Sequence, residues 1–458
     1  MGPRGRWIAF GLLAAGLTGF WLERRFPAPP SARLLIQADG PCAAGATALL
    51  SDLAELQNRW VVLPPGSPAV PRTQLLRLHL GRQSEVMTLQ AELDGQSLPP
   101  QRGSPGEVFA GLARSLTLRP PGPALLPARP DEAWKLLDLA GRTQDEASLP
   151  LVMESEALAV HEPRCALARF AYANLLTRYL VEHLEADTLD AQTACERNFQ
   201  EGLSDLPGYP RLTALFAIHL SDIGRQREAM DLLADALHRH PGATELLNSL
   251  AYAARTSGLL ATADKALERR ADLVGQRRGQ ASLADNALLY GGHIEAFASS
   301  VESLPPGPLR AFYSGYARLL QGDREGALVR FKEARMGGLG SSLFVRLAEV
   351  YGSALEGRDA EALANLDTLE SERTQIHLPD GEFTFKVAEA YGFLGQPAKA
   401  LDLAERASVQ GFGCAPWFER APFLADARKL PKWLSLDQHL RERQTLLADR
   451  FPPSRFGL

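Results

Sequence analysis

The sequence predicts a mainly α-helical fold, in which a helical solenoid follows a transmembrane helix and a small α/β domain. Alanines that share a sequence context recur at separations of 34, 64, 35 and 38 residues, namely Ala229, Ala263, Ala327, Ala362 and Ala400. The longest gap is close to twice a period of roughly 34 residues, which is typical of stacked helical hairpins. An uncharged apolar run at residues 7–22 and short alternating runs within residues 31–120 predict the other two parts.

Length and composition indicate an ordinary globular protein with more than one domain. The chain has 458 residues, of which 45% are hydrophobic and 22% charged. The 49 basic and 54 acidic residues leave a net charge of −5, which argues against a nucleic-acid partner because such a partner needs a concentrated basic face. We predict a membrane anchor and Pro-rich spacer at 1–30, a small α/β domain at 31–120, degenerate helical hairpins at 131–208, repeats at 209–410 and a C-terminal capping segment at 411–458.

The apolar run at residues 7–22 is slightly shorter than most membrane-spanning helices, but Trp7 and Trp21 stand at its two ends as interfacial residues do. A cleaved secretory signal is the alternative. Such a signal ends in small residues, whereas this run ends in Phe20, Trp21 and Leu22, so we favour an uncleaved anchor.

The charges that flank this run give a mixed signal for orientation. Arg4 and Arg6 favour a cytoplasmic amino terminus, and Arg24 and Arg25 oppose it. We expect a single-pass protein of the bacterial inner membrane, anchored through residues 7–22, with the bulk of the chain in the periplasm.

The pattern of residues 31–120 predicts two strands around a helix, then a hairpin, then a closing helix. The expected strands are 33–38, 60–63, 74–80 and 86–93, and the expected helices are 46–59 and 106–118. This order, with the closing run Ala113-Arg114-Ser115-Leu116, resembles the TolB amino-terminal-like domain, which often lies between an output or membrane segment and helical repeats in bacterial regulators. An unrelated small sandwich is the alternative.

Five later units resemble tetratricopeptide repeats, at residues 211–241, 244–270, 309–334, 343–369 and 382–407. Each has a glycine in mid-repeat where the first helix is expected to end, at Gly224, Gly258, Gly322, Gly357 and Gly395. The resemblance implies helical hairpins whose concave surface binds a protein or peptide.

The remaining helical segments match the repeat less well. Helices are expected at 131–141, 151–160 and 164–183. A weak unit is expected within 272–304, with Leu288 to Ile294 in its first helix and Val301 in its second.

The C-terminal segment resembles the closing segment of repeat-bearing bacterial regulators. The matching residues are Trp417, Phe418, Pro422, Phe423, Leu424, Arg428 and Trp433. A last helix at 434–447 has one apolar side and is expected to cap the array. We interpret Trp417 and Trp433 as core residues rather than binding residues, because aromatic side chains bury a large area.

Patterns that carry chemistry are missing from the sequence. It has no phosphate-binding G-x-x-x-x-G-K-[ST], no zinc-binding H-E-x-x-H and no nucleophile G-x-S-x-G. His238 and His240 are interpreted as cations that complement a helix C-terminus, and His219 has no recognisable nucleophile partner. We therefore assign no catalytic, cofactor-binding or metal residues and expect neither an enzyme nor a small-molecule ligand.

None of the four cysteines belongs to a Cys-x-x-Cys pair. We interpret Cys42, Cys165, Cys195 and Cys414 as thiols packed among apolar residues, since free cysteine is among the most buried residue types. A bridge between Cys165 and Cys195 is the alternative.

The function expected from the sequence is that of a membrane-anchored scaffold that binds a protein or peptide in its repeats. A sensory or regulatory module that lacks its output domain is the first alternative, suggested by the order of α/β domain, repeats and tail. A hydrolase site hidden in the α/β domain is the second alternative, and no cluster of polar residues supports it.

Overall fold

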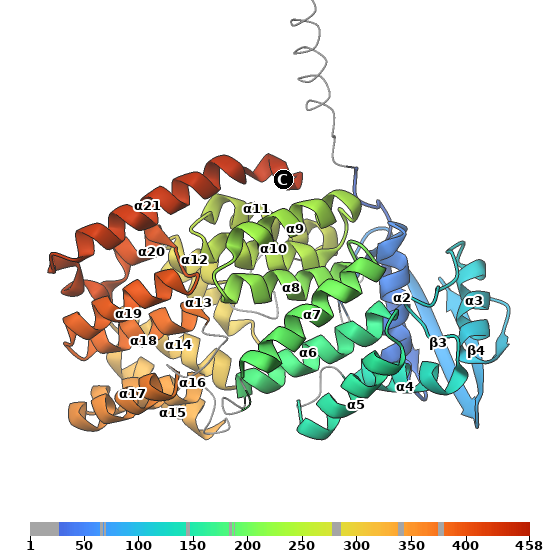
Figure 1. Cartoon of the computed structure of the whole chain (residues 1–458), viewed down its shortest axis with the longest axis horizontal. Helices are drawn as coiled ribbons and strands as arrows, with labels where there is room; N and C mark the ends of the chain where they lie inside the picture. Colours follow the sequence, from blue (N-terminus) through green and yellow to red (C-terminus); the bar gives the residue numbers. More distant parts are fainter. Residues whose placement is uncertain are drawn as a thin grey trace, which may run out of the picture.

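The computed structural model describes residues 27–64, 67, 70–142, 147–182, 186, 188–276, 285–337, 343–373 and 380–458. The molecule is elongated, with a β-sheet at one end of its long axis and the last helical hairpins at the other (Figure 1). The predicted anchor lies outside the described residues. Within the part of the chain that the structure describes, no helix combines the length and the apolar character that crossing a bilayer requires.

The α/β domain is built on a six-stranded sheet in the order β2-β1-β3-β4-β5, with β6 also pairing with β4. Strand β1 runs parallel to β2 and β3, whereas β3 and β4 form an antiparallel hairpin. The elements are β1 (Arg33–Asp39), α2 (Ala43–Leu56), β2 (Val61–Val62), β3 (Thr73–Gln83), β4 (Val86–Leu93), β5 (Gln96–Ser97), β6 (Gln101–Gly103) and α3 (Pro105–Ser115).

The sequence pattern accounts for most of this domain. Leu76, Leu78 and Leu80 are buried on alternate positions of β3, as a strand with one covered face requires. The hairpin turn is tighter than expected, because β3 and β4 stay paired as far as Gln83 and Val86. Strands β5 and β6 were not predicted, since two and three residues are too few to show an alternating pattern.

Four helices connect this domain to the repeats: α4 (Pro130–Arg142), α5 (Leu149–His161), α6 (Ala166–Glu182) and α7 (Leu189–Asp205). Helix α7 was missed by the sequence analysis. Cys195 and Phe199 are the only apolar side chains among its buried residues other than a glycine. The helical spacing of apolar residues is therefore hard to recognise in its sequence.

The six hairpins of the repeat region follow in chain order. They are α8 (Pro210–Asp222) with α9 (Gln226–Arg239), α10 (Thr244–Thr256) with α11 (Leu260–Val274), α12 (Asn286–Tyr290) with α13 (Ile294–Glu302), α14 (Pro308–Leu320) with α15 (Arg324–Met336), α16 (Leu343–Leu355) with α17 (Asp359–Arg373), and α18 (Gly381–Phe393) with α19 (Pro397–Val409). Ile294 begins the second helix of the weak hairpin, so its placement in the first helix was wrong.

The mid-repeat glycines end the first helices as expected, and the recurring alanines are packing positions. The recurring alanine is fully buried in all five units, where it lets neighbouring helices approach closely. The mid-repeat glycine has a positive φ in all five units, between 69° at Gly395 and 85° at Gly322. This left-handed backbone ends the first helix at little cost only where there is no Cβ. The region is therefore an array of tetratricopeptide-like helical hairpins.

The chain ends in α20 (Ala415–Arg420), the short helices η2 (Pro422–Leu424) and η3 (Ala427–Lys429), α21 (Trp433–Arg450) and η4 (Pro453–Phe456). Helix α21 does more than cap the last hairpin, because it runs back along one side of the array to α9 and α11 (Figure 1). Arg450 and Arg455 both pair there with Asp231 of α9. Arg269 of α11 donates to the carbonyl oxygen of Gly457.

The buried apolar residues form two large cores. The first core extends from the sheet through α11, and the second extends from α12 to the first half of α21. Helix α21 contributes Trp433, Leu436 and Leu440 to the second core and Leu447 to the first. The last helix therefore joins the two cores of the molecule.

Candidate binding site on the first helices of the repeats

The first helices of the six hairpins, α8, α10, α12, α14, α16 and α18, form a row that we call the inner row. Residues 411–424, here the tail segment, pack on its second part. The Trp417 ring lies 5.7 Å from that of Tyr290 on α12, and the Phe423 ring lies 6.0 Å from Tyr316 on α14 and 6.1 Å from Tyr351 on α16. Part of the surface expected to receive a partner is thus covered by the chain itself.

A buried ion pair lies beneath the tail segment. Lys386 and Glu389, one turn apart on α18, are 2.8 Å apart, and their side chains are 1% and 0% exposed. Glu389 also accepts hydrogen bonds from Tyr316 at 2.7 Å and from the Trp417 indole at 3.0 Å. A buried carboxylate is tolerated only with such a full set of partners. The tail segment therefore supplies one donor that this ion pair uses.

A second buried carboxylate, Glu382, lies at the start of α18. It accepts from Arg255 of α10 at 2.9 Å, from Asn286 of α12 at 2.8 Å and from the hydroxyl of Tyr290. Burial alone would raise the pKa of Glu382, but the Arg255 charge and these hydrogen bonds outweigh it and hold the pKa below its usual value. Glu382 therefore links three inner-row helices as a charged group.

The pKa values of two further acids, Asp222 and Asp380, are raised instead of lowered. Tyr252 donates to Asp222 at 2.5 Å, and burial together with the Asp380 charge raises the pKa of Asp222. Asp380 accepts from the backbone N–H groups of Glu382 and Phe383, yet burial and the Glu382 charge raise its pKa to about 6. Three carboxyl groups thus share one region, and they repel one another when all are charged.

We call Asp222, Tyr252, Arg255 and Asp380 the inner polar patch. All four are partly exposed, in contrast to the covered residues around Lys386. Two polar atoms close to the patch are buried without a hydrogen-bond partner among the described residues, namely the Arg255 Nε and the Asn286 Oδ1. The exposed parts of the patch side chains can donate to and accept from a polar group of a bound chain, and the carboxyl groups favour a cationic neighbour.

Across the described ranges, no group of three or more His, Cys, Asp or Glu side chains has the arrangement of a metal site.

None of the inner polar patch residues was predicted from the sequence as a binding residue. A sequence signal was available only for the covered ion pair, because Lys386 and Glu389 stand one turn apart in the otherwise mostly apolar helix α18.

The residues weighed in the sequence analysis lie elsewhere or in the core. Trp417 and Trp433 are 2% and 7% exposed, so their interpretation as core residues is confirmed. The His219 ring packs between Phe199 at 5.5 Å and Phe216 at 6.3 Å.

The interpretation of His240 as a cation at a helix end was wrong. Burial lowers the pKa of His240, and its Nδ1 lies 3.3 Å from the carbonyl oxygen of Glu55 on α2. The imidazole is therefore neutral near pH 7 and joins the α/β domain to the array instead of complementing a helix dipole. The sequence pattern failed here because it did not show that α2 covers this helix end.

All four cysteines are free thiols in the structure. Cys165 and Cys195 are each 1% exposed, and the Cys195 sulfur lies 3.5 Å from the Thr177 hydroxyl. Burial raises the pKa of Cys165 to about 12 and that of Cys195 to about 11. The interpretation as buried thiols is confirmed for Cys165, Cys195 and Cys414, whereas Cys42 is a thiol that is only half-buried.

Comparison with known proteins adds little to this picture. No family model and no curated protein matches the sequence. The structure of the human IFIT1 dimer with m7Gppp-AAAA is 14% identical, over 74% of this chain and 76% of that chain, with a TM-score of 0.33. The P58(IPK) TPR domain is 12% identical, over 72% of this chain and 96% of that chain, with a TM-score of 0.20. At these scores neither structure carries an argument about the site.

Proposed function

We propose that the protein is a non-catalytic interaction scaffold that binds an extended protein segment at the inner polar patch. The proposal rests on a difference in exposure between the two parts of the inner row. The tail segment packs on the side chains of α12, α14 and α16 and reaches α10 at the last residue of that helix, where the Gly413 N–H donates to the Thr256 carbonyl oxygen. Tyr252 and Arg255 on α10 stay partly exposed. Stacked hairpins commonly offer such a surface to a partner chain.

Site-specific photocrosslinking in cells tests the proposal. A photoreactive phenylalanine analogue at Tyr252 should yield a crosslinked protein, and Asp222→Asn together with Arg255→Ala should remove that product. The same analogue at Val329, which is 65% exposed on α15, is the matched control and should yield no such product. A product that disappears on ribonuclease treatment, or one that survives the double substitution, would argue against a protein partner at this patch.

We further propose that residues 7–22 anchor the scaffold in a bacterial inner membrane with the bulk of the chain in the periplasm. The apolar run, its terminal tryptophans and the preceding arginines support this topology. Alkaline phosphatase and green fluorescent protein, fused separately after Leu458, test it. Phosphatase activity with a dark fluorescent fusion is the expected result, and a bright fluorescent fusion without phosphatase activity would reverse the topology.

A further inference from the structure

Helix α5 exposes an apolar stripe. Leu149, Met153 and Val160 are 51%, 60% and 67% exposed. Their spacing of four and then seven residues places all three on the same face of an α-helix, where the exposed Glu156, seven residues after Leu149, also lies. On its opposite face the same helix buries Leu151 and Leu158, so it is apolar on both sides. Surface helices are normally polar on the outer side, and an exposed apolar stripe indicates a contact surface.

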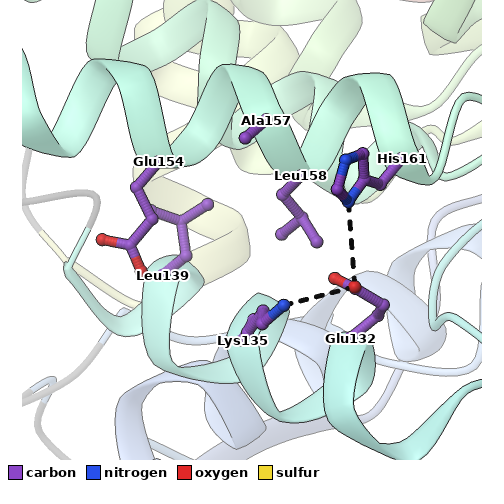
Figure 2. A pocket seen from close by; sticks show the side chains of 7 residues that line it. All are labelled: Glu132, Lys135, Leu139, Glu154, Ala157, Leu158 and His161. Carbon is purple, nitrogen blue, oxygen red and sulfur yellow. Dashed lines mark hydrogen bonds and ion pairs between the residues drawn. The ribbon is translucent and has the colours of Figure 1, made fainter.

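A pocket of about 200 Å³ opens between α4 and α5, next to this stripe (Figure 2). Leu139 of α4 and both Ala157 and Leu158 of α5 give it apolar walls. Pockets for small-molecule ligands are usually larger, at roughly 300–1,000 Å³. This volume suits a single long side chain better than a cofactor.

Glu132 lies at the edge of this pocket, and one of its two carboxylate oxygens accepts no hydrogen bond from the described residues. Glu132 is 2% exposed, and its Oε1 lies 3.2 Å from the Lys135 Nζ, 3.7 Å from an Arg129 guanidinium nitrogen and 3.9 Å from the His161 Nδ1. The Oε2 is buried without a hydrogen-bond partner. A buried carboxylate oxygen without a donor is costly, so a donor from a bound molecule would be stabilising here.

The carboxylates around the stripe outnumber the cations of α5 and favour a basic partner, although Glu154 already lies 3.3 Å from Arg142 and Glu156 accepts from the Tyr172 hydroxyl at 3.2 Å. The charged residues within α5 other than its terminal histidine are Glu154 and Glu156, and Glu162 follows directly. Figure 2 shows Glu154 at the end of the pocket opposite His161. The pocket lining therefore has two carboxylates and one lysine when its histidine is neutral.

We propose that the exposed face of α5 docks a basic amphipathic helix of another protein, one arginine or lysine of which enters the α4–α5 pocket and donates to the Glu132 Oε2. The apolar residues of that helix cover Leu149, Met153 and Val160. Its remaining basic residues lie opposite Glu154 and Glu156. This α5 surface is separate from the inner polar patch, so the two sites can be tested independently.

The probe for the test is a fluorescent synthetic helix of about 15 residues, long enough to be helical when bound, with leucines along one face and arginines on both sides of it. Its anisotropy is measured with the full-length protein. We expect saturable binding that weakens as salt increases. Glu132→Gln should weaken it about tenfold, since the pocket then lacks its charge. Met153→Ser with Val160→Ser should weaken it by a similar factor.

Met336→Ser is the matched control, because Met336 is 82% exposed on α15, away from α5, and its substitution should leave the affinity unchanged. Thermal melting of each variant checks that folding is intact. Equal binding of a peptide with glutamates in place of the arginines, or no loss with Glu132→Gln, would overturn the proposal. A dimer in light scattering that Met153→Ser dissociates would also overturn it, because the occupant of the stripe would then be a second copy of this chain.

Discussion

Asp380 and Glu382 stand two positions apart, yet their pKa values move in opposite directions. Glu382 gains the Arg255 charge and hydrogen bonds from three side chains, which outweigh its burial. Asp380 accepts two backbone hydrogen bonds as the N-cap of α18, but it is half-buried beside the charge of Glu382. At the residue scale the number of donors, rather than depth, decides which acid stays charged.

Asp380→Asn should stabilise the protein above pH 6. An acid whose folded pKa of about 6 exceeds its usual 3.8 binds its proton more tightly when folded, so stability falls as pH rises between these values. Asparagine keeps the capping oxygen and tolerates the φ of 43° at this position. We expect a gain of about 1–2 kcal/mol at pH 7.5 that vanishes below pH 4, measured by urea unfolding. An equal gain at both pH values would contradict this account.

Glu382→Gln should have the opposite pH dependence. The lowered pKa of Glu382 contributes stability that is present above its usual value of 4.5 and lost as pH falls through the folded value. The amide also leaves the Arg255 charge without its counter-ion. We expect a loss of about 2–4 kcal/mol at pH 7.5 and a smaller loss at pH 3, by the same urea titration. A loss that does not change with pH would assign a purely steric role to Glu382.

The four thiols should differ in reactivity. Burial raises the pKa of Cys165 and Cys414 to about 12 and that of Cys195 to about 11. It also raises the pKa of Cys42, but this thiol is only half-buried, so a reagent can reach it. Iodoacetamide at pH 8 should therefore modify Cys42 in the native protein and leave the others intact, as read by mass spectrometry. Full labelling after denaturation is the control. Rapid native labelling of Cys195 would show that α7 opens readily.

At the scale of elements, close backbone contacts fix how helices meet. Gly45 of α2 faces the backbone of α4, where a Cβ would overlap the carbonyl oxygen of Leu137. Gly392 of α18 similarly faces the carbonyl oxygen of Phe423 in the tail segment. Both contacts bring together elements far apart in the sequence. The sequence therefore predicts where these helices lie along the chain, but only the tertiary structure shows which helices pack together.

Gly45→Ala should destabilise the protein although alanine is the better helix former. Propensity alone would favour the change by about 1 kcal/mol, but the new methyl group would push α2 and α4 apart at a cost of about 2–4 kcal/mol. Gly106→Ala in α3 is the matched control, because nothing lies within 4 Å of the added carbon. Thermal unfolding should show a lower midpoint for the first variant and an unchanged or higher midpoint for the second. The same result for both would refute the close contact.

At the scale of the whole molecule, α21 holds the two cores together. Its first half lies in the second core, and Leu447 with Phe451 and Phe456 beyond it lies in the first. Additional contacts join it to the turns within the first two hairpins, including Arg443 with Gln226 and Gln444 with the carbonyl oxygen of Gly258. The terminal helix therefore connects the last hairpins of the array back to the first two.

Phe451→Ala should release the end of the chain. Phe451 is fully buried, and truncation of such a ring costs about 3–5 kcal/mol. We expect limited proteolysis to cut within residues 431–458 while the rest of the chain stays protected. Leu446→Ala is the control, because Leu446 is 72% exposed on α21 and its loss should change little. Protection of the tail in the Phe451 variant would mean that the polar contacts alone hold it.

The sequence by itself determined the helical hairpins, their glycine ends and the main strands, because these depend on local periodicity and on backbone preferences. It also placed Trp417 and Trp433 in the core. Only the tertiary structure decided which polar residues meet, since Arg255 and Glu382 are brought together across 127 positions of sequence. It likewise decided that the tail segment covers part of the inner row and that α21 returns to α9. The identity of such long-range partners cannot be predicted from a repeating pattern, because the separation of the two residues in sequence depends on the whole fold.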